Sequence, residues 1–143
     1  MLQLDGIDRS FGNRLVLDDV SFTVERGRLT GFVGGNGAGK TTAMRIILGV
    51  LSADDGTVTL DGTPLTRRMR NAFGYMPEER GLYPKIRVAE QITYLARLHG
   101  IDKESADRRA RDLLDRLGLA ERADDDLEAL SLGNQQRAQI AAA

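Results

Sequence analysis

Apolar and polar residues alternate along much of the first half of the chain, with the period of two that β-strands produce. The alternation covers Leu2–Asp8 and Val20–Val24. Shorter apolar runs at Thr57–Leu60 and Asn71–Met76 each end at turn residues. A further apolar run, Leu29–Gly34, is typical of a strand buried on both faces. This half is therefore predicted to be rich in strands.

In the second half the hydrophobic period changes from two to 3.6, as in helices that bury one face. The spacing predicts one helix from Arg87 to the residue before Gly100 and another over Lys103–Leu117. A third helix is expected after Gly133, running to the end of the sequence. The first half contains one helical segment, Lys40–Leu48, directly after a glycine-rich stretch.

That glycine-rich stretch, G-G-N-G-A-G-K-T-T, matches the phosphate-binding loop pattern G-x-x-x-x-G-K-[ST]. Glycines allow positive φ, so backbone N–H groups turn inward around phosphate oxygens, and the adjoining helix start favours an anion. Lys40 is expected on the β and γ phosphates, and the Thr41 hydroxyl on Mg²⁺. The alternative is a glycine-rich turn without a ligand. The predicted phosphate ligands are Gly34, Gly35, Asn36, Gly37, Ala38, Gly39, Lys40, Thr41 and Thr42.

Charge and composition narrow the possible partners. Lys and Arg number 20 against 21 Asp and Glu, a balance that does not favour nucleic acid, and we expect none as a partner. The chain has no cysteine, which excludes disulfides and thiolate metal sites. The longest apolar stretch, near Ile46–Leu51, is far shorter than the ~20 residues that cross a bilayer. A basic cluster, Arg67, Arg68 and Arg70, is interpreted as a solvated face.

Three further segments lie around this loop in the sequence: the one containing Phe11, then Gly74–Pro84, then Leu130–Arg137. Together with the P-loop, they resemble motifs of the nucleotide-binding subunits of ABC transporters. Phe11 stands where that family has an aromatic side chain that stacks on adenine, although it also fits a core or edge aromatic. Gly74–Pro84, G-Y-M-P-E-E-R-G-L-Y-P, resembles the Q-loop, with Glu78 in place of the usual glutamine. The resemblance implies that Glu78 reaches Mg²⁺ directly or through water, and the alternative is a plain charged turn.

The third segment is Leu130–Arg137, L-S-L-G-N-Q-Q-R, which is similar to the ABC signature L-S-G-G-Q. Ser131 and Gly133 match the signature, whereas Leu132 and Asn134 depart from it. In the family this segment contacts the ATP held by the opposite subunit, so the resemblance makes Ser131 and Gly133 nucleotide ligands. Taken alone, Ser131 is an ordinary helix N-cap.

The resemblance implies an α/β fold, the ABC type of P-loop NTPase. Residues 1–84 would form the ATP-binding core, with antiparallel strands, the P-loop strand and helix, and the Q-loop. Residues 85–143 would form a helical subdomain that carries the signature. The family's Mg²⁺-linked aspartate, catalytic glutamate and switch histidine have no counterpart, and His99 is interpreted as structural. We therefore expect a domain truncated after the signature, lacking the C-terminal part of its core sheet.

The implied function is ATP hydrolysis that drives transport across a membrane, with Lys40, Glu78 and Ser131 acting in catalysis. The implied cofactors are ATP and Mg²⁺, and the partners are a second ATP-binding subunit and a transmembrane subunit. The implied location is the cytoplasmic face of the cell membrane. The P-E-E-R-G-L-Y-P variant resembles a bacterial subgroup linked to sodium or drug export, which favours export.

Other functions remain as alternatives. One is a nucleotide-binding module without catalysis, and for this chain alone we expect weak binding with little turnover. A DNA-repair or chromosome ATPase shares the P-loop and signature, but it carries a long coiled coil between them, and no sustained heptads occur here. A small-molecule kinase shares only the P-loop. No residue pattern identifies a transported substrate.

Overall fold

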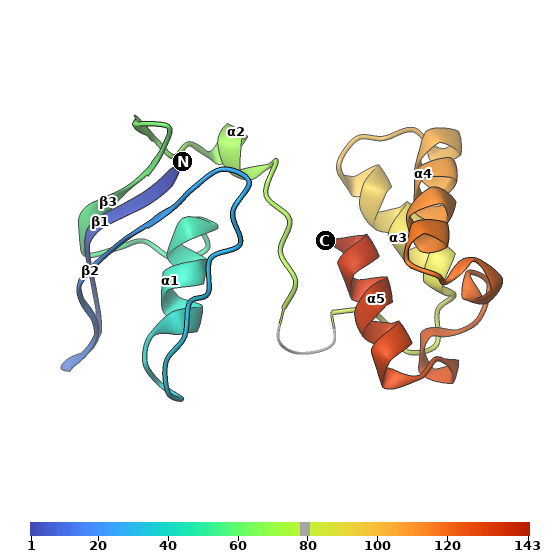
Figure 1. The fold of residues 1–143 in the computed structure, drawn as a ribbon, viewed down its shortest axis with the longest axis horizontal. Helices are drawn as coiled ribbons and strands as arrows, with labels where there is room; N and C mark the ends of the chain where they lie inside the picture. Colours follow the sequence, from blue (N-terminus) through green and yellow to red (C-terminus); the bar gives the residue numbers. More distant parts are fainter. Residues whose placement is uncertain (78–80) are drawn as a thin grey trace. The chain divides into compact units, whose positions relative to one another are not determined.

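A computed structural model describes residues 1–77 and 81–143, which form two compact units (Figure 1). Unit 1 is Met1–Phe73 and unit 2 is Gly74–Ala143. The boundary between the compact units lies upstream of the 84/85 boundary suggested by the sequence. None of the helices in the described residues is long and apolar enough to cross a membrane.

Unit 1 is built on an antiparallel sheet with the strand order β2-β1-β3-β4 (Figure 1). The strands are β1 (Leu2–Phe11), β2 (Arg14–Val24), β3 (Asp55–Leu60) and β4 (Thr63–Pro64). This confirms the three predicted strands near Leu2, Val20 and Thr57, each extended beyond its predicted bounds. β1 lies between β2 and β3, and its side chains Leu4 and Ile7 are almost fully buried in a core shared with Ala43, Ile46 and Ile47.

Two predicted strands are absent from their places. Leu29–Gly34 and Asn71–Met76 have irregular backbone, and the predictions that they are strands were wrong. A strand needs a neighbour to satisfy its backbone hydrogen bonds, and no strand in the described residues pairs with either segment. The side chains of Leu29 and Val33 are consequently exposed. One phenylalanine of each segment, Phe32 and Phe73, still packs against the core of unit 1, and the Phe32 ring centroid lies 4.9 Å from that of Phe22.

Helix α1 (Lys40–Ile47), the predicted helical segment, packs its apolar face on the sheet. Its core side chains are Ala43, Ile46 and Ile47, joined by Leu4, Ile7, Leu17 and Leu65. A short helix, α2 (Arg67–Arg70), holds the basic cluster. Arg67 and Arg68 are exposed as interpreted, but Arg70 donates from Nε to the Ile47 carbonyl at 2.8 Å. Arg70 thus satisfies one of the carbonyls left open at the end of α1.

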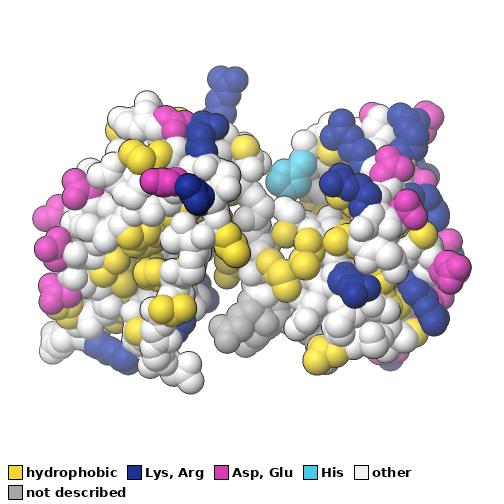
Figure 2. All heavy atoms as spheres, in the orientation of Figure 1, with side chains coloured by type: hydrophobic (Ala, Val, Ile, Leu, Met, Phe, Trp, Pro, Cys, Tyr) yellow, Lys and Arg dark blue, Asp and Glu magenta, His cyan; other side chains and the backbone are white. Residues whose placement is uncertain are grey.

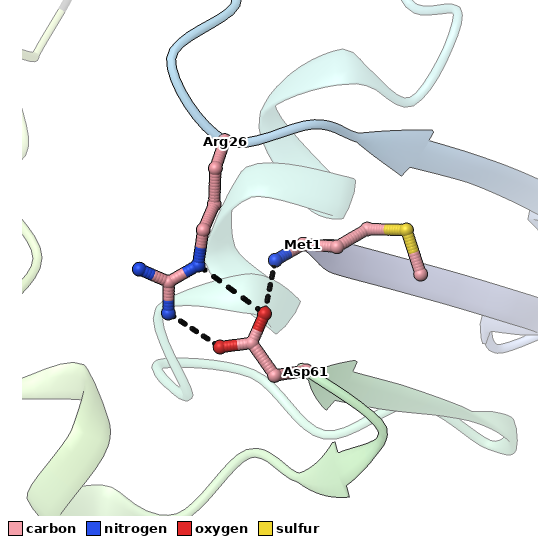
Figure 3. Close-up of polar contacts among 3 residues, drawn as sticks. All are labelled: Met1, Arg26 and Asp61. Carbon is pink, nitrogen blue, oxygen red and sulfur yellow. Dashed lines mark hydrogen bonds and ion pairs between the residues drawn. The ribbon is translucent and has the colours of Figure 1, made fainter.

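An exposed ion-pair network ties the β3–β4 turn to both ends of the β1–β2 hairpin (Figure 3). Asp61 accepts from the Met1 ammonium group, and from the Arg26 guanidinium at 2.5 and 3.3 Å. The hydrogen bond and charge of Arg26, and then those of the chain's amino group, hold the pKa of Asp61 well below its usual range. The network contributes stability above the pKa of an unfolded aspartate and loses it as the pH falls.

Unit 2 contains the three predicted helices, α3 (Val88–Leu98), α4 (Lys103–Arg116) and α5 (Leu132–Ala142), and two short 3₁₀ turns, η1 (Ala120–Arg122) and η2 (Leu127–Ala129). Asp102 caps α4 by accepting from the Ser105 N–H at 2.9 Å, which lowers the pKa of its carboxyl. The buried face of α3 ends before Leu98, whose side chain is 65% exposed. The buried core includes Val88, Ile92, Leu114, Leu119, Leu127 and Ala138.

Candidate nucleotide-binding site

The last glycine of the P-loop lies directly against β2. Gly39 forms the N-cap of α1 in the left-handed region, with φ 82°. A Cβ on Gly39 would lie 2.5 Å from Leu17 Cδ2 and 2.8 Å from the Val16 carbonyl oxygen. Both the torsion and the close approach therefore require glycine. The sheet thus holds the end of the loop where the backbone turns into α1.

Lys40 folds back across the loop that precedes it. Its ammonium group donates to the carbonyl oxygens of Gly34 at 2.7 Å and Gly35 at 2.8 Å. An ammonium group has three donors, so one more is available for an anion at the loop. The positive charge that the sequence assigned to the phosphates therefore lies at the mouth of the glycine-rich loop.

The start of α1 leaves its backbone donors available. No side chain caps this helix end, and its first turn has no acidic residue. The first N–H groups of a helix have no partner within it, and the helix dipole favours negative charge there. The exposed loop and first turn thus provide N–H donors, one ammonium group and the hydroxyls of Thr41 and Thr42. This donor set fits a polyphosphate.

The described residues fit Mg²⁺ as an ion held largely by its nucleotide. No group of three or more Asp, Glu or His side chains able to hold a metal occurs within residues 1–77 and 81–143. Mg²⁺ in nucleotide sites takes one or two protein ligands and completes its shell with phosphate oxygens and water. The exposed Thr41 hydroxyl is suited to that role. Glu78, the other predicted ligand, lies outside the described residues.

The β1–β2 hairpin brings a second cation to the loop. Phe11, the predicted adenine-stacking residue, is half exposed at the end of β1, with the Arg9 guanidinium carbon 4.9 Å from its ring centroid. Its partner in the β2 register is Arg14. Arg14 Nη2 lies 3.6 Å from the position that a Cβ on Gly37 would occupy. Sequence reasoning missed Arg14, because its only local signal was its nearness to Phe11.

The signature-like residues belong to unit 2. Ser131 is the N-cap of α5, and its hydroxyl oxygen accepts from the Asn134 N–H at 3.4 Å. Gly133 follows in the first turn of the helix, exposed, with open space where a Cβ would lie. The structure confirms the N-cap, while the predicted contact of Ser131 and Gly133 with ATP stays a prediction. A hydroxyl that accepts from backbone can still donate its proton to a phosphate.

Unit 2 also has an apolar pocket of about 580 Å³ beside the segment that resembles the Q-loop. One wall is the turn Leu82–Ile86, and the other is the exposed side of α3. Figure 2 shows charged side chains of both signs interspersed over the surface of unit 2, the right-hand part of that view. The lining residues are Gly81, Leu82, Tyr83, Ile86, Glu90, Gln91, Tyr94, Leu95 and Leu98.

Comparison with known proteins identifies the family to which the chain is similar. The family described as ABC transporter matches residues 17–143. YhaQ of Bacillus subtilis, named an uncharacterized ABC transporter ATP-binding protein, is 40% identical over 143 residues, 100% of this chain and 48% of YhaQ. The linearmycin resistance ATP-binding protein LnrL of Bacillus subtilis is 33% identical over 146 residues, 100% of this chain and 47% of LnrL. The chain spans about half the length of the curated relatives it matches.

A solved structure, an ATP binding subunit of an ABC transporter, superimposes with a TM-score of 0.81 and 29% sequence identity over 100% of this chain and 61% of its own. Relatives named for opposite directions of transport also match. The ribose import ATP-binding protein RbsA of Caldanaerobacter subterraneus is 36% identical over 99% of this chain and 30% of RbsA. The Nod factor export ATP-binding protein I of Burkholderia lata is 35% identical over 96% of this chain and 46% of its own. The chain belongs to the ABC transporter family and matches the ATP-binding domain of its members.

Proposed function

We propose that this chain binds ATP with Mg²⁺ at the Gly34–Thr42 loop, and that within a longer subunit it hydrolyses ATP to drive transport. One observation carries the proposal: the Lys40 ammonium group lies across the glycine-rich loop, at the uncapped start of α1. The family hydrolyses ATP, so a bound nucleotide is the expected substrate. In such sites catalysis is mainly positioning and charge neutralisation, for which Lys40 and the helix N–H groups are suited.

A second part of the proposal concerns a dimer that this subunit would form with another ATP-binding subunit. Ser131 and Gly133 present a helix start, and we propose that they contact the γ phosphate of ATP held by a second ATP-binding subunit. Glu78 is proposed to meet Mg²⁺ directly or through water. Because Glu78 is the only acid assigned to the site, turnover by this chain alone is proposed to be slow.

The partner in the membrane is proposed to dock at the apolar pocket of unit 2. Its exposed lining includes Tyr83, Tyr94 and Leu98, and a short amphipathic helix is the shape that such a groove takes. Binding there would place the subunit at the cytoplasmic face of the cell membrane. We propose export as the direction, on the P-E-E-R-G-L-Y-P resemblance, although matched relatives are named for import as well as for export.

The test is Lys40→Ala, measured by titration with the fluorescent analogue mant-ATP in the presence of Mg²⁺. A charge-assisted hydrogen bond contributes about 1.5–3 kcal/mol, so affinity should fall roughly 10- to 150-fold. Lys103→Ala, which removes an exposed lysine of unit 2, serves as the matched control and should bind like the parent. Equal affinity of the Lys40→Ala variant and the parent would refute the proposed site.

A further inference from the structure

Among the described residues, Gln91 is the one polar or charged side chain that is buried, at 4% exposure. It makes three hydrogen bonds to one turn of the backbone. Its Oε1 accepts from the Tyr83 N–H at 2.7 Å, and its Nε2 donates to the carbonyl oxygens of Tyr83 at 2.9 Å and Ile86 at 2.7 Å. The side-chain amide thus matches both donor and acceptors of the turn.

Other contacts hold the far side of the same turn. The Glu128 N–H donates to the Pro84 carbonyl at 2.9 Å, and the Leu127 N–H donates to the Ile86 carbonyl at 3.3 Å. Tyr83 has no such bond to the Leu127–Glu128 segment. Its N–H bonds to Gln91, and its carbonyl accepts from Gln91 and, at 3.4 Å, from the Ile86 N–H within the turn. Gln91 is therefore what anchors Tyr83 to the rest of unit 2.

This anchored turn forms one wall of the apolar pocket. Tyr83 and Ile86 line it from the turn, and Tyr94, Leu95 and Leu98 line it from α3. Residues 91, 94, 95 and 98 have the i, i+3, i+4, i+7 spacing of one helix face, so Gln91 begins the row that forms the opposite wall. A helix wall is rigid by its own hydrogen bonds, whereas a loop wall depends on what holds it.

We propose that Gln91 is a positioning residue, which holds the loop wall of this pocket in the conformation that admits a helix of the membrane partner. The inference rests on the docking site proposed above and assigns its shape to one side chain. It requires the amide itself. Leucine would leave the Tyr83 N–H without a partner and would remove one of the two donors that each of the Tyr83 and Ile86 carbonyls has. Glutamate would keep the acceptor but turn a carboxylate toward two carbonyl oxygens.

The glutamate variant supplies a signature that simple loss of packing does not produce. In Gln91→Glu, burial and the facing carbonyls raise the pKa of the introduced carboxyl. Protonation then restores an O–H donor toward Tyr83 or Ile86. In this variant the Leu82–Ile86 turn should therefore be disordered near neutral pH and become ordered again in acid. Glu90 is the other carboxylate that lines the pocket, and it is unchanged in the parent and in every variant.

The experiment measures the width of the pocket in the full chain. The sequence has no cysteine, so Lys85→Cys in the turn and His99→Cys at the end of α3, both exposed, take two nitroxide labels. Pulsed electron–electron double resonance measures the distribution of distances between the two labels. We expect a narrow distribution with Gln91, and one about twice as broad in Gln91→Ala and Gln91→Leu, because the turn becomes free to open. Gln91→Glu should be broad at about pH 7.5 and narrow at about pH 5. Gln139→Ala, a partly buried glutamine of α5, should match the parent.

A narrow distribution in Gln91→Ala, or a Gln91→Glu variant that does not respond to pH, would overturn the inference. Circular dichroism identifies a variant that has failed to fold, and in that case the pH response of Gln91→Glu decides. Titration with mant-ATP separates this result from the proposed function, because the P-loop lies in unit 1 and Gln91 in unit 2. Failure of every variant and the parent to bind mant-ATP would refute nucleotide binding and leave the distance result standing.

Discussion

Helices α1 and α5 both begin at a proposed phosphate contact, yet their first turns are prepared differently. Gly39 begins α1 without a side-chain cap, and Lys40 places an ammonium group at the loop. Ser131 begins α5 and caps it with its own hydroxyl oxygen. An uncapped start with its own cation can bind polyphosphate unaided, whereas a self-capped start without one is suited to assist at an anion that is already held.

The glycines of the two helix starts differ in the same way. A Cβ on Gly39 would collide with β2, and its φ of 82° is left-handed, while a Cβ on Gly133 would meet open space at ordinary torsions. The fold of this chain therefore demands glycine at position 39. It makes no such demand at position 133, so any need for glycine there must come from a partner molecule.

The largest expected effect follows from Gly39→Ala. A left-handed torsion costs an alanine about 1–2 kcal/mol, and the collision with the Val16 carbonyl adds to that cost. The free energy of unfolding, measured by urea denaturation, should therefore fall by about 2 kcal/mol or more. Binding of mant-ATP should be lost with it.

Gly133→Ala is the matched change at α5. It should leave stability unchanged or raise it by about 0.5–1 kcal/mol, because alanine favours helix over glycine. Equal destabilisation by the two substitutions would contradict the difference drawn between the two helix starts.

Ser131→Ala is expected to cost about 1 kcal/mol through loss of the N-cap of α5, measured as a shift of the unfolding midpoint. Ser131→Asp should restore that stability, since aspartate caps equally well. In the intact dimeric subunit the aspartate variant should still lose activity, because it adds a negative charge where a γ phosphate is proposed. A fully active aspartate variant would reduce Ser131 to a cap.

Arg14→Ala tests whether Lys40 is the only cation at the start of α1 that contributes to nucleotide binding. Its guanidinium is exposed, so we expect mant-ATP affinity to fall only about 3- to 10-fold, and the difference to shrink at high salt. Arg68→Ala, an exposed arginine of α2, is the control. An Arg14→Ala variant indistinguishable from that control would leave Lys40 as the sole cation of the site.

The smallest expected effects are changes in melting temperature when one exposed carboxylate in each unit, Asp61 or Asp102, is replaced by an amide. Asp61→Asn removes the pairing with Arg26 and the chain's amino group, and should lower the melting temperature slightly near neutral pH. Because the pairing depresses the pKa of Asp61, this difference should shrink progressively as the pH falls below about 4, the pKa of an unfolded aspartate. In unit 2, Asp102→Asn keeps an N-cap residue and should change the melting temperature less. A difference for Asp61→Asn that persisted in acid would rule out the ion pair as its cause.

Much of the fold follows from local patterns. The helical period predicted α3 and α4 to within a residue or two, and the alternation predicted β1 and β2. The failure at Leu29–Gly34 has a physical cause: an apolar run specifies that a segment could pair, but a strand exists only where another strand meets it. The P-loop was recognised because a phosphate cradle is built from consecutive residues.

By itself, the sequence determined the elements whose causes are local: the helix faces, the turns and the glycine-rich loop with its lysine. Tertiary structure decided what depends on residues distant in the chain. Only the packed sheet shows that Leu17 closes on Gly39 and that Arg14 reaches Gly37. Only the folded helices turn Gln91 inward to hold Tyr83. Hydrogen bonds and close contacts between separated segments depend on the three-dimensional path of the chain, which local periodicity does not encode.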